Sequence, residues 1–127
     1  MIVDTAGLFP QTKGIILTCV SIPSERLTRG TVFWDFDFVG ELEGAETPYR
    51  ESVPIWLAGP IFKALGFPEV TPGRFDVEPM KAVNRQIVCD ILYEVVKDKP
   101  YARIKNAKAV DQTGLKPEDL TAEGIPF

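Results

Sequence analysis

The chain has 127 residues, 45% of them hydrophobic and 10% aromatic, with a formal net charge of −4, which predicts one packed domain and excludes a disordered chain. Histidine is absent and no Cys-x-x-Cys pair occurs, so we expect neither a zinc site nor a histidine general base. No apolar run approaches the roughly 20 residues that cross a bilayer, and the first residues lack the basic region of a signal peptide, which predicts a cytoplasmic protein with no membrane partner.

Residues 15–22 predict the first β-strand, because a β-branched run stands there between Gly14 and Pro23. The run is apolar on much of both faces, so we expect it to be buried, and it would also permit a homo-oligomer. A polar connection follows, and its tip carries two cations, Arg26 and Arg29.

Residues 31–42 predict the second strand and show the most regular alternation in the sequence. One face is aromatic and is expected to pack in the core, because three rings on one strand face are more often core than a binding platform. The other face carries Phe33 beside two carboxylates, Asp35 and Asp37. No third carboxylate completes a metal site, so we expect this second face to be solvated.

A third strand is predicted over residues 49–55, after a loop. Trp56 follows this strand and is expected to lie in the core. Residues 57–66 predict a short helix that ends at Gly66, a residue suited to the turn after a helix. Residues 67–80 contain three prolines and predict an irregular connector.

Residues 86–108 predict a β-hairpin, because period-2 alternation breaks at residues 97–100 and then resumes. The second arm places Tyr101, Arg103 and Lys105 on one face. An aromatic ring followed by two cations suits unpaired nucleic acid, since the ring stacks on a base and the cations attract phosphates. A solvated strand face with cross-strand pairs has the same composition, so the hairpin alone leaves both interpretations open.

The charge is unevenly distributed along the chain. Residues 81–108 contain seven basic and three acidic side chains, a net charge of +4, so the remainder carries −8. This asymmetry, with an acidic segment near the C-terminus, is typical of a nucleic-acid-binding protein with an acidic tail.

Reactive chemistry is not expected. Cys19 and Cys89 lie within apolar strand patterns and are expected to be reduced core side chains. The sequence has no nucleophile motif, no glycine-rich phosphate loop and no clustered carboxylates, so we expect neither an enzyme nor a cofactor.

The predicted element order, three strands, a short helix and two strands, is that of the OB-fold, a five-stranded Greek-key barrel. We therefore expect a mainly β domain over residues 1–110 and a flexible acidic tail over residues 111–127. Such barrels bind oligonucleotides on strands 2 and 3 and on the loops that follow strands 1 and 4, which here predicts a site for single-stranded DNA. The candidate DNA-binding residues are Arg26, Arg29, Phe33, Tyr49, Arg50, Lys97, Lys99, Tyr101, Arg103 and Lys105.

Four segments between Lys13 and Ala109 resemble small phage proteins of OB type that coat single-stranded DNA. These segments are KGIILTCVSIPSER, GTVFWDFDFVGELEG, FKALGFPE and ILYEVVKDKPYARIKNA. The resemblance implies sequence-independent binding and protection of single-stranded DNA during replication, recombination or repair.

The sequence Ile-Pro-Phe at residues 125–127, after an acidic segment, resembles the tip of bacterial single-stranded DNA-binding proteins. The resemblance implies that Phe127 enters an apolar pocket of a replication or recombination protein of the host or the phage, while acidic neighbours steer the approach. Ala122-Glu123-Gly124 stands where that family has aspartates, so we expect docking that is weaker or tuned to a different partner. The candidate partner-binding residues are Asp119, Glu123, Ile125, Pro126 and Phe127.

The main alternative is a structural or assembly β-barrel of a virus, with no nucleic-acid role. The net charge of −4 and the carboxylates Asp35 and Asp37 favour this alternative. Salt-sensitive binding of an oligonucleotide would separate the two functions, because only the first requires it.

Overall fold

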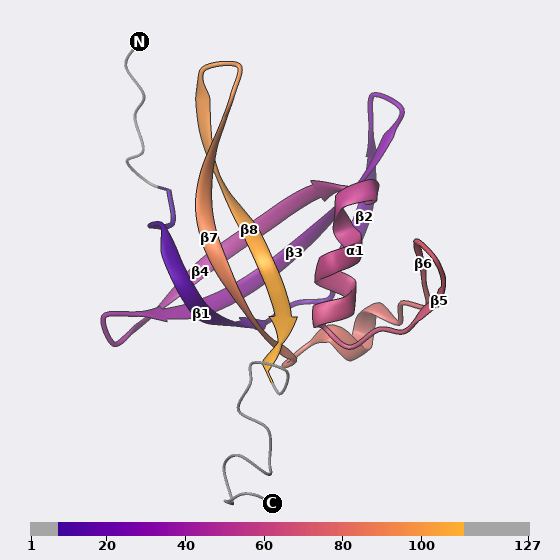
Figure 1. Ribbon diagram of the computed structural model, residues 1–127, viewed down its shortest axis with the longest axis horizontal. Coiled ribbons are helices and arrows are strands. Elements are labelled where there is room, and N and C mark those ends of the chain that lie inside the picture. The colour runs from indigo at the N-terminus through magenta and orange to yellow at the C-terminus, as the bar shows by residue number, and fades with distance from the viewer. Residues whose placement is uncertain (1–7, 111–127) are drawn as a thin grey trace, which may run out of the picture.

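An antiparallel sheet makes up most of the computed structural model, which describes residues 8–110 (Figure 1). Its one α-helix, α1, spans Ile55–Ala64, and a 3-10 turn spans Pro79–Ala82. The strands are β1 (Thr12–Cys19), β2 (Ser24–Thr28), β3 (Thr31–Leu42), β4 (Ala45–Pro54), β5 (Glu69–Thr71), β6 (Arg74–Phe75), β7 (Gln86–Val96) and β8 (Lys99–Ala109). Within these residues no helix is long and apolar enough to span a membrane.

Strand β3 is the centre of the six-stranded sheet. It pairs with β2 near its start, with β4 along most of its length and with β1 near Phe38, and β1 in turn pairs with β7, which pairs with β8. All of these pairs are antiparallel, and β5 and β6 form a separate two-stranded hairpin. Strands β4 and β8 are therefore ends of the strand order, although side chains link them directly.

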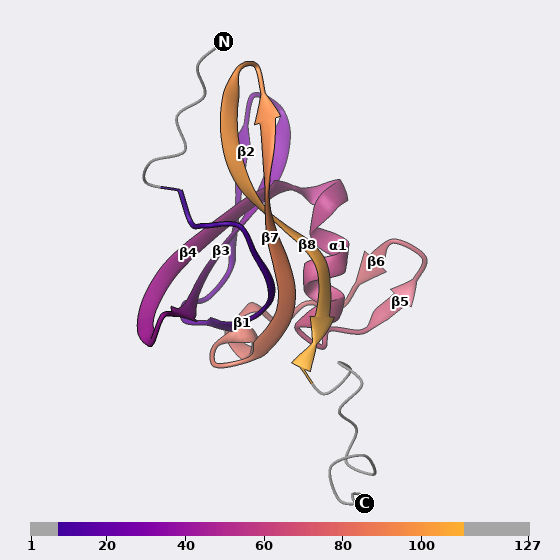
Figure 2. The same ribbon diagram turned by 60° about the vertical axis from the view of Figure 1, so that its left-hand side comes forward.

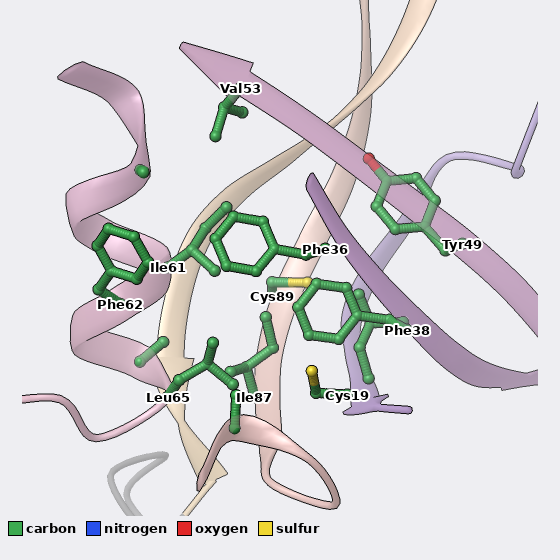
Figure 3. Packing of buried hydrophobic residues seen from close by; sticks show 14 of the residues in the cluster. Cys19, Phe36, Phe38, Tyr49, Val53, Ile61, Phe62, Leu65, Ile87 and Cys89 are labelled. Carbon is green, nitrogen blue, oxygen red and sulfur yellow. The ribbon is translucent and has the colours of Figure 1, made fainter. Parts of the chain in front are cut away.

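The hydrophobic core lies between the curved sheet and α1. Phe36 and Phe38 from β3 are almost fully buried, and Phe62 of α1 packs edge-on against Phe36 with ring centroids 5.8 Å apart (Figure 3). Cys19 and Cys89 are buried free thiols in the same core, which confirms their predicted structural place. Burial raises the pKa of both thiols, so they stay neutral.

Several predicted elements are confirmed. The strand over residues 31–42 has the predicted bounds, the helix begins two residues earlier than expected, and the β7–β8 hairpin lies where alternation placed it. Its turn is shorter than predicted, because only Lys97 and Asp98 connect the strands, with φ of 51° and 66°. A two-residue turn with positive φ at both positions matches the right-handed twist of the flanking strands.

Two predicted loops are wrong. Ser24–Thr28 forms β2, which pairs with the start of β3 through an Arg29-Gly30 turn, so Arg26 lies on a strand and not in a loop. All five side chains of β2 are exposed, so no apolar alternation revealed the strand. The connector over residues 67–80 contains the β5–β6 hairpin, whose turn is built around Gly73.

Candidate nucleic-acid interface

The outer face of β2, β3 and β4 gathers the first half of the predicted site. Arg26 of β2 lies opposite Phe33 of β3, and Asp37 of β3 lies opposite Arg50 of β4. Because successive side chains on a strand point to opposite faces and Phe36 points into the core, these residues share the outward face.

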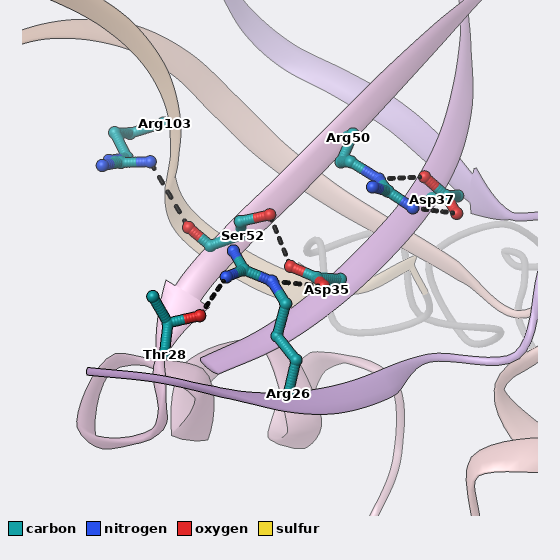
Figure 4. A network of polar contacts seen from close by, with 7 residues as sticks. All are labelled: Arg26, Thr28, Asp35, Asp37, Arg50, Ser52 and Arg103. Carbon is teal, nitrogen blue, oxygen red and sulfur yellow. Dashed lines mark hydrogen bonds and ion pairs between the residues drawn. The ribbon is translucent and has the colours of Figure 1, made fainter. Parts of the chain in front are cut away.

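Two ion pairs cross this face (Figure 4). Arg26 donates from Nε to Oδ2 of Asp35 at 2.8 Å, and Arg50 donates from Nε and Nη2 to Asp37 at 2.8 and 3.3 Å. Ser52 donates to the other oxygen of Asp35 at 2.6 Å. The predicted solvated carboxylate face is thus a network in which each carboxylate neutralises an arginine.

The carboxylates of this network are ionised. Hydrogen bonds from Arg50 lower the pKa of Asp37 below its ordinary value, against a smaller opposing effect of burial. Burial favours the neutral form of Asp35, but hydrogen bonds from Ser52 and Arg26 outweigh it and lower that pKa too. The face is therefore less positive than its arginines alone suggested.

Strand β8 adds the second half of the site. The Arg103 guanidinium lies 5.2 Å from the centre of the Tyr101 ring and donates to the main-chain oxygen of Ser52 at 3.4 Å. Arg103 and Lys105 both approach Glu94 of β7, at 3.7 and 3.2 Å. The predicted trio on β8 does share one face, as its alternation indicated.

A groove runs between β4 and β8 on this side of the molecule. Its volume is about 450 Å³, and Arg50, Ser52, Tyr101 and Arg103 line it together with Leu8 and Phe9. The volume falls within the range of about 300–1,000 Å³ of ligand sites. Side chains distant in sequence thus meet around one hollow that offers a ring, two guanidinium groups and a hydroxyl.

Two hairpin tips project beyond the sheet toward the same end of the molecule (Figures 1 and 2). The β2–β3 tip carries Arg29, and the β7–β8 tip carries Lys97 and Lys99 beside Asp98. None of these three cations takes part in an ion pair within residues 8–110. All three are exposed, so they are open to an approaching phosphate.

Two aromatic predictions require correction. Tyr49 was expected to stack on a base, but it is 6% exposed and belongs to the core cluster (Figure 3). Its ring packs edge-on against Phe9, with ring centroids 5.3 Å apart. Tyr49 alternates with Arg50 along β4, so its side chain points inward, and the residue forms part of the wall of the groove from that side. Trp56 was expected in the core, yet it is 69% exposed at the start of α1, beside exposed Ile55 and Leu57.

Two polar residues of the site escaped prediction. Ser52 links Asp35 to β8, and Glu94 pairs with both cations of β8. The signal for Glu94 was present in the sequence, since the hairpin places it directly opposite Tyr101 and alternation places it on the same β7 face as Leu92, which lies opposite Arg103. The predicted partner-binding residues Asp119, Glu123, Ile125, Pro126 and Phe127 lie outside the described residues.

Residues 8–110 hold no group of three metal-ligating side chains. No protein-family model matches the chain, and a search of curated proteins found no relative.

Proposed function

We propose that the chain binds single-stranded DNA without sequence preference and protects it during replication or recombination. The observation that carries this proposal is the groove between β4 and β8, where Arg50, Tyr101 and Arg103 converge. A ring for stacking next to charged donors for phosphate is the combination that sequence-independent binding requires.

We also propose that the sheet is an OB-type barrel. Strands β1, β3, β4, β7 and β8 supply the five strands in the expected order, and α1 lies between β4 and β7. The pairing of β1 with both β3 and β7 supports this topology, and side-chain contacts between β4 and β8 support closure. In such a barrel the β3–β4 face and the two projecting hairpins are the surfaces that contact oligonucleotides.

Binding would exchange some existing ion pairs for phosphate contacts. The free cations at the hairpin tips attract the backbone first, and Arg50 and Arg103 then share their donors between carboxylate and phosphate. Each base stacked on Tyr101 or Phe33 contributes about 1–3 kcal/mol. About four phosphate contacts give a slope of log affinity against log salt of roughly −3 for a single strand.

A titration of short oligo-dT at two salt concentrations tests the proposal, with tryptophan fluorescence as the signal. Arg103→Ala and Tyr101→Ala should each weaken binding about tenfold, since each removes a charge-assisted contact or a stacking surface. Arg74→Ala, on the remote β5–β6 hairpin, makes the same charge change as Arg103→Ala and should leave affinity within about twofold. Equal losses in Arg103→Ala and Arg74→Ala would refute the groove as the site.

The ion pairs of the face favour the second candidate, an assembly barrel of a virus. Asp35, Asp37 and Glu94 neutralise the three arginines there, as expected for a face whose cations stabilise the fold and do not bind phosphate. This candidate predicts no salt-sensitive binding of oligo-dT to the wild-type chain.

We propose in addition that residues 117–127 recruit a replication or recombination protein, on the resemblance of Ile125-Pro126-Phe127 to the bacterial tip. Removal of Phe127 should abolish that recruitment and leave oligo-dT affinity unchanged, which pull-down from a bacterial lysate and titration measure separately.

A further inference from the structure

Glu51 is the one acidic or basic side chain that is buried within residues 8–110, with 2% of its surface exposed. It lies on the inward face of β4, next to Tyr49 on the same face, where β8 passes close to β4. The strand order gives β4 and β8 no shared ladder among the described pairs, so the contacts of these two side chains connect the strands.

Three contacts at this position each need one proton. The oxygen of Tyr49 lies 2.5 Å from Oε1 of Glu51 and 3.0 Å from the main-chain oxygen of Ala102, and the amide of Ile104 donates to Oε2 of Glu51 at 3.0 Å. The phenol and the amide supply two protons. If Glu51 is ionised, one oxygen–oxygen contact of Tyr49 has no proton between its atoms.

A protonated Glu51 satisfies all three contacts. Its carboxyl then donates to the Tyr49 oxygen, Tyr49 donates to the Ala102 carbonyl, and the Ile104 amide donates to the remaining carboxyl oxygen. A buried network that is fully satisfied is stable, whereas one with an unmatched polar atom is costly.

The charged groups around Glu51 do not supply a counterion. Arg103 and Lys105 of β8 line the same hollow, of about 230 Å³, but both lie against Glu94 of β7, which lines it too. No ion pair of the described chain reaches Glu51. From β7, burial keeps the Cys89 thiol neutral by raising its pKa to about 12.

The remaining surroundings of Glu51 are apolar or neutral. Helix α1 contributes only Leu57, Pro60 and Ile61 to the hollow. Burial raises the pKa of Tyr49, so its phenol keeps its proton and serves as a donor.

We propose that Glu51 carries a proton at neutral pH and, with Tyr49, clamps β8 onto β4 and thereby positions Arg103 for DNA. The positioning step rests on the function proposed above, whereas the protonation does not. Ala102 and Ile104, the two residues that Tyr49 and Glu51 contact, flank Arg103, which donates to the main-chain oxygen of Ser52 on β4. Glu51 and Tyr49 are thus positioning residues, which act on Arg103 through the strand that carries it.

The pH dependence follows from this geometry. Burial raises the pKa of Glu51 above its ordinary value, although hydrogen bonds and the two cations of β8 oppose the shift. The pKa of Glu51 is higher in the folded chain than in the unfolded chain. The contribution of protonated Glu51 to the free energy of unfolding is therefore complete below the unfolded pKa of about 4.3 and is lost as pH rises through the folded-state pKa.

Glu51→Gln tests the protonation directly, because a glutamine amide donates and accepts at the same atoms as a neutral carboxyl. We expect the thermal midpoint of the variant to match the wild type near pH 4 and to exceed it increasingly as pH rises. Carbon NMR of the Glu51 carboxyl should show the proton retained at pH 7. A titration at the ordinary pKa, with a variant less stable at every pH, would overturn the proposal.

Positioning is tested with oligo-dT and a double-mutant cycle. Tyr49→Phe should weaken binding about tenfold, as expected for one charge-assisted contact, and should have no further effect in an Arg103→Ala background. Tyr93→Phe removes a hydroxyl from β7 and should leave affinity unchanged. Additive losses from Tyr49→Phe and Arg103→Ala would refute the positioning role. If the wild type binds no DNA, the proposed function fails while the NMR titration still decides the protonation.

Discussion

Replacing Asp37 with Asn should strengthen DNA binding, even though Asp37 is not one of the proposed DNA-binding residues. In the folded chain Arg50 donates two hydrogen bonds to the Asp37 carboxylate. The side chain of Arg50 is 63% exposed and lies at the edge of the groove. The substitution removes the competing negative charge and keeps the size of the side chain. Arg50 then offers its full charge to a phosphate.

The size of the effect follows from the geometry of the pair. A phosphate bound on the far side of the Arg50 guanidinium would lie about 6 Å from the Asp37 carboxylate, where two like charges repel by about 0.7 kcal/mol in water. Screening at about 0.1 M salt reduces this value to about half. Affinity at this salt concentration should therefore rise about twofold, and the salt slope should steepen by up to about 0.7.

The fold should tolerate the change. The ion pair is exposed and contributes about 0–1 kcal/mol to stability, and Ser21, which donates to Asp37 at 2.9 Å, keeps an acceptor in asparagine. Glu46→Gln provides the matched control, since it makes the same change in net charge at the far end of β4, next to the β3–β4 turn.

Fluorescence anisotropy of labelled oligo-dT at several salt concentrations measures both quantities. A gain in Asp37→Asn that Glu46→Gln does not share supports phosphate contact at Arg50. Equal gains in the two variants would indicate a general charge effect, and a loss in Asp37→Asn would falsify the assignment of Arg50 to the interface.

Two further predictions concern the core and the helix. Phe36→Ala should lower the free energy of unfolding by about 3–5 kcal/mol in urea denaturation, because the ring is fully buried between Phe38 and Phe62; a cost below about 1 kcal/mol would contradict this packing. Trp56→Phe should change stability by less than about 0.5 kcal/mol, whereas Trp34→Phe should cost more than about 1 kcal/mol, because Trp34 packs on Phe62 at 5.0 Å; the reverse order would place Trp56 in the core.

Long, regular alternation made the main strands of the fold predictable. Strands β3 and β7 carry apolar residues at every second position over most of their length, because one of their faces lies on the core. Strand β2 carries only Leu27 as an apolar residue and has no buried side chain. Pairing with β3 and the bond from Arg26 to Asp35 hold it, and neither depends on a local hydrophobic pattern.

The composition of the candidate site was predictable, but its electrostatics were not. The cations of the groove are visible in the sequence, whereas their neutralisation depends on register, which places Asp37 opposite Arg50 across two strands. The inward direction of the Tyr49 side chain could not be predicted from the sequence for a related reason. Glu51 shares its face, and an acidic residue normally marks a face as solvated.

Side chains of Tyr49 and Glu51, and not a main-chain ladder, join β4 to β8 among the described strands. An unpaired strand edge can template the addition of strands from other molecules, and such addition leads to aggregation. Tyr49 and Glu51 occupy part of the boundary between β4 and β8. They therefore make the edges of these two strands less available to a strand from another molecule. Because side chains and not a main-chain ladder make this link within residues 8–110, the distance between β4 and β8 can increase slightly while the hydrogen-bonded ladders of the sheet stay intact.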